Sequence, residues 1–384
     1  MSEQPLSLRF AVVTHAVMVD GEDNFGPAHN VVEALVALGL EVVFVLHPLS
    51  SSGTGFFRRF RNGVLVEELR VRYGRPARVW EALRNGWLAV SGQSDVLVLV
   101  DPLNFATAGL VRRLLRRRGL VVYYTADYAD RRFANPLANR LYHGLDRAAI
   151  RAAHVVWNVS RPIREKRRRQ GVPEQDNVFV PNAASFDPDW IVPFEQRAPE
   201  SLVMVGSLDP FLDDRLLLDT LGLLCAHRPR IRTTIVGTGS GEAMFRKELV
   251  RRSLTENVQL TGHLPRPEAL SIVRDCRVGL ALYSGRASWN EYRDSVKVRE
   301  YLSLGVPVVT TGNHPLAAEL ESRGAGVVVR EAQEAVSAID ALLGPAGSDV
   351  ADRAAQMGLD YDRDSIMRAA LADLSARLAE QGHR

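Results

Sequence analysis

The chain has 384 residues, which at roughly 150 residues per domain predicts two or three domains. With 46% hydrophobic and 24% charged residues, its composition excludes a disordered, collagen-like or coiled-coil protein. Residues 1–190 hold 25 basic and 19 acidic residues, a net charge of +6, and the remainder hold 23 and 26, a net −3. The arginines of the basic half follow helical spacing with few aromatic residues between them, so we expect no nucleic-acid partner.

The two cysteines, Cys225 and Cys276, each lie within an apolar run, which favours buried thiols over a disulfide or a metal site. The longest apolar runs are far shorter than the roughly 20 residues of a membrane-spanning helix. The N-terminal residues lack the basic and apolar regions of a signal peptide. These patterns predict a cytoplasmic protein with reduced cysteines.

Short β-branched runs alternate with helical stretches along the chain, which is typical of parallel sheets with crossover helices. In the first half, the predicted strands are residues 9–13, 41–46, 96–100, 121–124 and 154–157. The alternation stops after residue 180, at a polar stretch that contains proline. In the second half, the predicted strands are residues 202–205, 232–236, 258–260, 278–282, 306–309 and 326–329. A final amphipathic helix is expected over residues 365–379.

The pattern predicts an α/β protein made of two Rossmann-like, doubly wound parallel-sheet domains that face a central cleft. We place the first domain at residues 1–182, a linker at 183–199 and the second domain at 200–362. A C-terminal helix at 363–384 could pack back on the first domain. Open sheets of this kind bind ligands beyond the carboxyl ends of their strands, so functional residues are expected in the loops that follow strands.

Glycine-containing loops follow three of the predicted strands. Gly26 begins a helix after the first strand, which suits the presentation of amide groups to a phosphate, and a plain helix start explains it equally well. In the second domain, Gly206 follows one strand, and Gly237 and Gly239 follow the next, where missing side chains suit the approach of a phosphate or a sugar. The third glycine of the dinucleotide fingerprint is absent at its proper spacing, which weakens a dehydrogenase interpretation.

Residues 290–309 are the most informative stretch of the chain. A charged loop leads into a predicted helix that starts near Ser295 and ends at Gly305, and a buried strand follows. Lys297 and Glu300 share one face of this helix. A cation near a helix N-terminus is unfavourable against the helix dipole, so Lys297 indicates an anionic partner; the alternative is a surface ion pair with Glu300. The chain contains only three lysines, which makes this one notable.

Three segments of the second domain carry a family resemblance. They are Val236-Gly237-x-Gly239, Asn257-Val-x-Leu-Thr-Gly262-His-Leu-Pro265 and Lys297-x-x-Glu300-Tyr301-x-x-x-Gly305-x-Pro307-Val308-Val309. In this order and spacing they resemble the nucleotide-sugar half of GT-B fold glycosyltransferases of the family 4 type, glycosyl transferases group 1. Weaker similarity around Gly26 extends the resemblance to most of the chain.

The resemblance implies a retaining, metal-independent transfer of a sugar from a nucleotide diphosphate sugar to a hydroxyl acceptor, with no cofactor. It implies that Glu300 holds the ribose of the donor. Lys297 and Arg293 are expected to stabilise the charge that develops on the leaving diphosphate. The predicted donor-binding residues are Gly26, Gly206, Gly237, Gly239, Tyr292, Ser295, Val296 and Glu300.

Some positions depart from the family pattern. Tyr292 stands where the family's Glu-x7-Glu motif has its first glutamate, and Ser207 stands where a basic residue often follows the strand. Asp127 lies near the position at which many relatives carry a histidine. Its carboxylate could hydrogen-bond the donor sugar or act as a base on the acceptor hydroxyl, or it could cap the next helix. Asp127, Lys297 and Arg293 are therefore the predicted catalytic residues.

The acceptor is expected on the basic first domain, as a small molecule, a lipid-linked sugar or a polysaccharide. Arg58, Arg59 and Arg61 lie in an aromatic and basic segment that suits contact with the acceptor or with the inner face of an anionic membrane, and equally a half-buried loop. Two alternative functions stay open. One is a nucleotide-sugar epimerase of the same architecture, and the other is a catalytically inert nucleotide-sugar-binding partner subunit.

Overall fold

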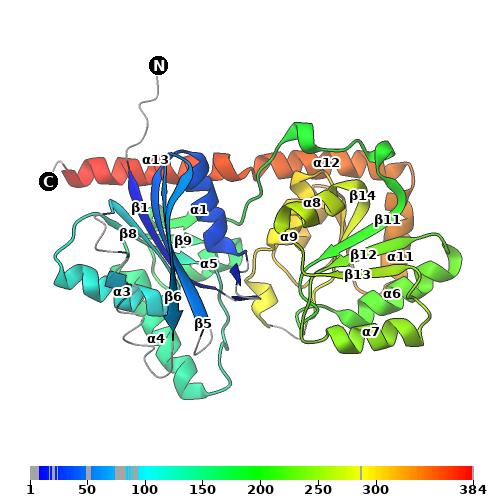
Figure 1. Ribbon diagram of the computed structural model, residues 1–384, viewed down its shortest axis with the longest axis horizontal. Helices are drawn as coiled ribbons and strands as arrows, with labels where there is room; N and C mark the ends of the chain where they lie inside the picture. The colour runs from blue at the N-terminus through cyan, green and yellow to red at the C-terminus, as the bar shows by residue number, and fades with distance from the viewer. Residues whose placement is uncertain are drawn as a thin grey trace. The chain divides into compact units, whose positions relative to one another are not determined.

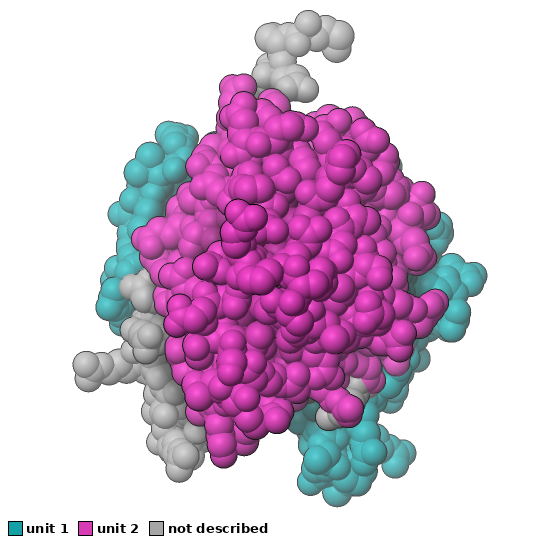
Figure 2. Space-filling model, turned by 90° about the vertical axis from the view of Figure 1, so that its right-hand side faces the viewer, with its two compact units in different colours: residues 1–182, 363–384 teal, residues 183–362 magenta. Residues whose placement is uncertain are grey.

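The computed structural model describes residues 8–16, 18–19, 22–23, 25–48, 53–73, 84, 86–87, 89, 94–285 and 288–382. The chain divides into two compact units, residues 1–182 with 363–384, and residues 183–362, which Figure 2 distinguishes by colour. Each unit is built on one large sheet with helices packed against it (Figure 1). Among the described residues, no helix is long and apolar enough to cross a membrane.

The first unit is built on an eight-stranded sheet whose order is β10-β9-β8-β7-β1-β4-β5-β6. Its strands are β1 (Arg9–Ala16), β4 (Glu41–Pro48), β5 (Gly53–Arg61), β6 (Val64–Tyr73), β7 (Val96–Val100), β8 (Leu120–Thr125), β9 (Val155–Asn158) and β10 (Asn177–Phe179). From β10 to β4 all neighbours are parallel, and β7 and β8 are buried along their whole length. Two short strands, β2 (Met18–Val19) and β3 (Glu22–Asp23), pair separately.

The edge of this sheet differs from the sequence prediction, because β4, β5 and β6 pair antiparallel. The segment predicted as a membrane contact or a half-buried loop is part of strand β5. Asn62 and Gly63 connect β5 to β6 with φ angles of 50° and 79°. These positive values fit a type I′ turn, for which Asn-Gly is a preferred sequence, so this dipeptide was the local signal for the hairpin.

Four helices follow strands of the first unit, and a fifth comes from the end of the chain. They are α1 (Pro27–Ala37), α3 (Pro102–Leu114), α4 (Pro136–Ala152), α5 (Arg161–Arg169) and α13 (Arg363–Gly382), with a 3-10 turn, η1 (Glu174–Asp176). Each of the first four has a proline in its first turn, where the missing N–H costs no helical hydrogen bond. Helix α13 packs on α1, and Arg363 of α13 pairs with Glu33 of α1 at 2.8 Å.

The second unit is built on a six-stranded parallel sheet with the order β13-β12-β11-β14-β15-β16. Its strands are β11 (Ala198–Val205), β12 (Arg232–Val236), β13 (Val258–Gly262), β14 (Cys276–Ala281), β15 (Val308–Thr311) and β16 (Gly326–Val329). Strand β15 begins two residues later than predicted. Val306 still closes the preceding helix, since its N–H donates to Tyr301 O at 2.8 Å, and Pro307 has no N–H.

Helices cover this sheet, and their apolar residues build its core. They are α6 (Asp214–His227), α7 (Glu242–Arg251), α8 (Arg266–Asp275), α9 (Val296–Ser303), α10 (Ala317–Ser322), α11 (Ala332–Leu343) and α12 (Ala346–Asp360), with 3-10 turns η2 (Pro188–Trp190), η3 (Phe194–Gln196) and η4 (Ser288–Glu291). Helices α6, α7 and α11 contribute to one core cluster with the strands, and α9 packs on α12. The stretch expected as a linker therefore lies in the second unit, where Arg197 is buried and donates to Leu304 O and Gly305 O at the end of α9.

A buried ion pair links helices α4 and α5 of the first unit. Arg167 donates to both carboxylate oxygens of Asp146, at 2.6 and 2.7 Å, and neither side chain is exposed by more than 1%. Tyr123 of β8 donates its hydroxyl to the same carboxylate at 2.7 Å, and burial followed by the charge of Asp146 raises the Tyr123 pKa. These contacts fix two helices against the strand that leads to Asp127.

Replacing Arg167 by Met is expected to lower the free energy of unfolding by about 3–5 kcal/mol, because Asp146 would stay buried without its cation. The double variant Arg167→Met/Asp146→Asn removes both charges and keeps an oxygen for Tyr123, so it should recover most of the loss. Urea unfolding of the full-length variants measures both effects. A single variant that loses less than about 1 kcal/mol, the range of an exposed pair, would contradict this account.

Candidate functional site

The switch point of the second sheet lies between β11 and β14. The chain continues from β11 to β12 and β13 on one side, and from β14 to β15 and β16 on the other. Open parallel sheets bind ligands outside the carboxyl ends of the strands at such a point. Gly206 directly follows β11, and Tyr283 and Ser284 lie just beyond the end of β14. Residues from the loops and from α9 therefore gather at this edge.

Lys297 reaches from the first turn of α9 to the end of β11. Gly206 has a φ of 135°, and a Cβ there would overlap the Lys297 Nζ and come within 2.9 Å of its Cε. The ammonium group thus fills the space that a side chain at 206 would need. A residue other than glycine would have both a strained backbone and a clash. Gly206 and Lys297, which sequence analysis assigned to one site, are in direct contact.

No carboxylate among the described residues forms an ion pair with Lys297. Its side chain is partly buried, and its Nζ lies 5.4 Å from the centre of the Tyr283 ring. Burial first, and then the positive charge of Arg293, lower the pKa of Lys297 to about 8, although Glu300 opposes them. The surface ion pair considered as an alternative is therefore wrong. A partly desolvated cation without a counterion favours an anionic ligand.

Helix α9 is anchored by its N-cap residue, Ser295. The hydroxyl of Ser295 accepts the N–H of Val298 at 3.3 Å and also bonds to the Tyr283 hydroxyl. Tyr283 in turn packs against His314, with ring centres 4.8 Å apart and ring planes tilted by 58°. Ser295 was predicted to bind the donor, and the structure gives it a capping role that positions Lys297. Tyr283 was not identified from the sequence, where only its place after a strand marked it.

Glu300 is buried on the same helix, three residues after Lys297. Its Oε1 accepts a hydrogen bond from Arg266 Nε at 2.7 Å, and its side chain is 9% exposed. Arg266 is the first residue of α8, and the sequence analysis did not select it. Arg266 thus orients the carboxylate that the family resemblance assigns to the ribose of the donor. Tyr301, the next residue, is fully buried and accepts the N–H of Val205 at 2.7 Å.

The glycines after β12 let two loops lie against each other. A Cβ at Gly237 would come within 2.2 Å of Gly206 O, and one at Gly239 within 2.6 Å of the Leu208 backbone. The space beside these two glycines is therefore occupied by protein backbone. Their structural role is to bring the loop after β12 alongside the loop after β11, which holds Gly206 in place.

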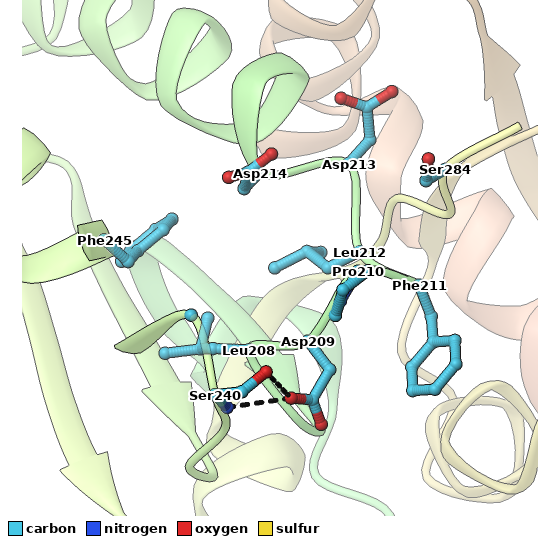
Figure 3. Close-up of a pocket in the computed structure, with 11 residues that line it drawn as sticks. Leu208, Asp209, Pro210, Phe211, Leu212, Asp213, Asp214, Ser240, Phe245 and Ser284 are labelled. Carbon is cyan, nitrogen blue, oxygen red and sulfur yellow. Dashed lines mark hydrogen bonds between the residues drawn. The ribbon is translucent and has the colours of Figure 1, made fainter. Parts of the chain in front are cut away.

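A cavity of about 590 Å³ lies beside these loops (Figure 3). It is lined by residues 208–214, by Ser240, Gly241 and Phe245, and by Ser284. Asp209 accepts hydrogen bonds from the Ser240 N–H at 2.8 Å and the Ser240 hydroxyl at 2.6 Å. Asp213 caps α6 by accepting the N–H of Leu216 at 3.0 Å. The cavity opens at the same carboxyl edge of the sheet as Gly206.

The remaining predicted residues of this loop differ in their exposure. Arg293 is exposed, and its guanidinium lies 5.2 Å from the centre of the Phe211 ring, which lines the cavity. Tyr292 is partly buried, and Val296 is the first residue of α9. Arg293 is close enough to Lys297 to lower its pKa. The positive charges of Arg293 and Lys297 therefore act on the same region.

Asp127 follows β8 in the first unit and pairs with Arg132 at 3.0 Å, with 46% of its side chain exposed. Helix α4 is capped by Asn135, which accepts the N–H of Leu137 and of Ala138. The expectation that Asp127 caps the next helix is therefore wrong. Its carboxylate is held at the carboxyl edge of the sheet by Arg132, whose own guanidinium lies 5.1 Å from the centre of the Tyr142 ring.

Gly26 is the N-cap of α1, and its carbonyl accepts the N–H of His29 at 2.9 Å and of Asn30 at 3.2 Å. The N–H of Gly26 donates to His29 Nδ1 at 3.1 Å, so this amide is engaged within the protein. The geometry is that of a helix start.

Arg58, Arg59 and Arg61 form ion pairs across the hairpin and its neighbour. Their partners are Glu68 at 2.7 Å, Glu67 at 3.3 Å and Glu41 at 3.1 Å. Phe56 and Phe57 are buried beneath them. The ion pairs offset the charges of the arginines, whereas Phe60 is only partly buried and Arg61 is exposed. Contact of this segment with an acceptor or a membrane stays a prediction.

Two structural expectations concern thiols and metals. Both cysteines are free; Cys276 is buried and Cys225 is partly buried. The pKa of Cys276 is raised to about 11, mainly by burial, so its thiol is not a reactive thiolate. Over the part of the chain that the structure describes, no group of three or more His, Cys, Asp or Glu side chains is placed to hold a metal ion.

Comparisons with known proteins show the family of this chain. Residues 28–183 match the model of the glycosyl transferase 4-like domain, and residues 199–344 match the model of glycosyl transferases group 1. The chain belongs to the GT-B glycosyltransferases of the group 1 type. It is therefore a glycosyltransferase, and its two α/β units are the Rossmann-like domains of that fold. A search of curated proteins found no relative of this chain.

Several solved structures share the fold at low sequence identity. Anabaena Alr3699/HepE in complex with UDP-glucose is 14% identical with a TM-score of 0.67, over 96% of this chain and 100% of that one. Sucrose-phosphate synthase from Thermosynechococcus elongatus is 15% identical with a TM-score of 0.66, over 97% and 100%. The lipopolysaccharide outer core galactosyltransferase WaaB is 12% identical with a TM-score of 0.61, over 96% and 100%.

The depressed pKa of Lys297 predicts a pH-dependent affinity for nucleoside diphosphates. In the free protein Lys297 loses its proton above about pH 8, and a bound diphosphate would raise its pKa. The dissociation constant of UDP should therefore increase between pH 7.5 and pH 9.5, by up to about tenfold per pH unit. Isothermal titration calorimetry measures this dependence.

The variant Lys297→Arg is the matched control, because arginine keeps its charge through this pH range. Its UDP affinity should be nearly independent of pH. The same slope in both proteins, or no slope in the unmodified protein, would contradict a role for Lys297 in binding the diphosphate.

Proposed function

We propose that the chain transfers a sugar from a nucleotide diphosphate sugar to a hydroxyl group of a carbohydrate or carbohydrate-like acceptor, with retention of the anomeric configuration and without a bound metal. The donor binds to the second unit at the switch point between β11 and β14. The observation that carries the proposal is the partly buried Lys297, which has no carboxylate partner among the described residues and lies against Gly206 at this point.

The leaving diphosphate gains negative charge as the glycosidic bond to the donor sugar breaks. Lys297 and Arg293 are the cations near the carboxyl edge that would stabilise this charge. A cation held in place by packing needs little reorganisation as charge develops, which favours the transition state over the bound donor. Glu300, oriented by Arg266, would hold the ribose of the same nucleotide.

The identity of the nucleotide can be proposed from proteins of the same fold. Anabaena Alr3699/HepE has been solved with UDP and with UDP-glucose, and the pneumococcal O-GlcNAc transferase GtfA with UDP and GlcNAc. UDP is therefore our first choice of nucleotide, and glucose and N-acetylglucosamine are the first sugars to test. Ser207 carries no charge, and Arg215 is exposed and pairs with Asp219 at 3.7 Å. We therefore propose Lys297 and Arg293 as the phosphate-binding cations.

The acceptor is proposed to bind to the first unit. Solved proteins of this fold include a lipopolysaccharide galactosyltransferase and a TarM complex that contains alpha-GlcNAc-glycerol, which supports a sugar or glycan acceptor. We further propose that the protein acts in the cytoplasm. Contact of Arg58, Arg59 and Arg61 with the inner membrane face stays a prediction, and their ion pairs with glutamates argue against it.

Product analysis tests this function. We expect UDP-glucose or UDP-N-acetylglucosamine to yield free UDP and an α-linked glycoside when incubated with methyl glycosides as acceptors, with a rate unchanged by excess EDTA. Proton NMR of the anomeric signal distinguishes the two configurations. A β-linked product would contradict retention, and loss of activity with EDTA would contradict metal independence. An epimerised donor, or UDP binding without turnover, would instead support the epimerase or the inert subunit.

A further inference from the structure

The first unit has a switch point of its own, between β1 and β7. The chain continues from β1 to β4 on one side, and from β7 to β8 on the other. His15 is the penultimate residue of β1, and Asp101 directly follows β7. His15 Nδ1 is in direct contact with Asp101 Oδ2, close enough for a hydrogen bond. A histidine–aspartate pair thus lies at the sheet edge where open parallel sheets bind ligands.

Asp101 is held rigidly by the start of α3. Its Oδ1 accepts the N–H of Leu103 at 2.8 Å and of Asn104 at 3.1 Å. Its φ of 74° is uncommon for a residue other than glycine. Burial raises the pKa of Asp101, yet the hydrogen bond and charge of His15, together with the Asn104 amide, hold that pKa below its ordinary value. The carboxylate is therefore charged and accepts the Nδ1 proton of His15.

This contact fixes the tautomer of His15. When Nδ1 donates to Asp101, the neutral imidazole presents Nε2 as a hydrogen-bond acceptor. The His15 side chain is 18% exposed, and no described residue forms a hydrogen bond with Nε2. The ring is thus oriented through Nδ1, and its Nε2 has no hydrogen-bond partner among the described residues, as in a group that receives a proton donor from a ligand.

Other hydrogen-bonding groups follow the neighbouring strands. His47, the penultimate residue of β4, has its ring centre 6.1 Å from that of His15 and bonds through Nε2 to Asn104 Oδ1 at 2.9 Å. Asp127 and Arg132 lie beyond the end of β8. This arrangement of imidazole, carboxylate and guanidinium groups at one edge suits a molecule with several hydroxyl groups.

We infer that His15 is an acceptor-binding residue: its Nε2 accepts a hydrogen bond from a hydroxyl group of a carbohydrate acceptor, and Asp101 is the residue that positions the ring. The bond orients the acceptor oxygen and increases its electron density while the proton stays on the oxygen. This inference rests on the proposed function and adds the acceptor subsite to it.

The first test is direct binding, which needs no turnover. We would label the nine histidines with 15N and record long-range proton–nitrogen spectra at pH 8, identifying His15 by comparison with His15→Asn. The expected tautomer has the proton on Nδ1. The Nε2 signal should shift saturably with at least one of four probes: the methyl glycosides of glucose, galactose, mannose and N-acetylglucosamine. An Nε2-protonated ring, or no saturable shift with any probe, would overturn the inference.

The second test compares two substitutions. Asparagine places its amide where Nδ1 stands and offers nothing at Nε2, whereas glutamine reaches the Nε2 position. With the methyl glycoside that shifts the His15 signal, His15→Asn should raise the acceptor KM by about tenfold, and His15→Gln by clearly less. His227→Asn, which removes an imidazole from the surface of the second unit, is the control and should change nothing.

The donor side separates failure of this inference from failure of the proposed function. Affinity for UDP and hydrolysis of the UDP-sugar without acceptor should match those of the unmodified protein in both His15 variants. If His15→Asn leaves the acceptor KM unchanged, or weakens UDP binding equally, the acceptor subsite is wrong while the donor site stands. If the unmodified protein does not bind UDP, the proposed function fails, and the glycoside titration of His15 still decides the subsite.

Discussion

The contact between Lys297 and Gly206 is the constraint on which the donor site depends. An ammonium group can occupy this place only because Gly206 has no Cβ and tolerates a φ of 135°. Gly237 and Gly239 must also lack a side chain, because this lets the loop after β12 lie against the loop after β11. Ser295 and Tyr283 fix the start of α9, and Arg266 orients Glu300 one turn later. The cost of this arrangement is a partly desolvated cation, which a diphosphate would stabilise.

Both units use the same topological device to place their polar residues. In each sheet, successive strands are first added on one side of the first strand and then on its other side. The strands that flank this switch point are β11 and β14 in one unit and β1 and β7 in the other. The second unit places Gly206 and Lys297 there, where we propose that the donor binds, and the first unit places His15 and Asp101 there, where we propose that the acceptor binds. The two sites therefore differ in chemistry in the way that a charged donor and a hydroxylated acceptor require.

The sequence predicted the fold well where its signal was periodic. Alternating β-branched and amphipathic runs located the parallel strands and the helices, and Ser295 and Gly305 marked the ends of α9. It failed at the β5–β6 hairpin, because apolar and polar residues do not alternate along the sequence Phe56-Phe57-Arg58-Arg59-Phe60-Arg61, and only Asn62-Gly63 indicated the turn. Lys297 and Glu300 stood out through local spacing. Tyr283, Arg266, His15 and Asp101 did not, because their partners are distant in the chain and are brought together by the sheet.

The central claim is that Lys297 has a lowered pKa and binds the diphosphate of the donor. Because the chain contains only three lysines, this claim can be tested directly. Protein labelled with 13C at lysine Cε should give three resolvable signals over a pH titration. Contacts with Asp130 and Tyr128 outweigh the effect of burial and raise the pKa of Lys166, whereas burial lowers that of Lys297 to about 8. We predict one signal that titrates near pH 8, that disappears in Lys297→Arg and that moves to higher pH when UDP is added. Three signals that all titrate above about pH 10, near the ordinary lysine value, or a Lys297 signal unaffected by UDP, would contradict the account.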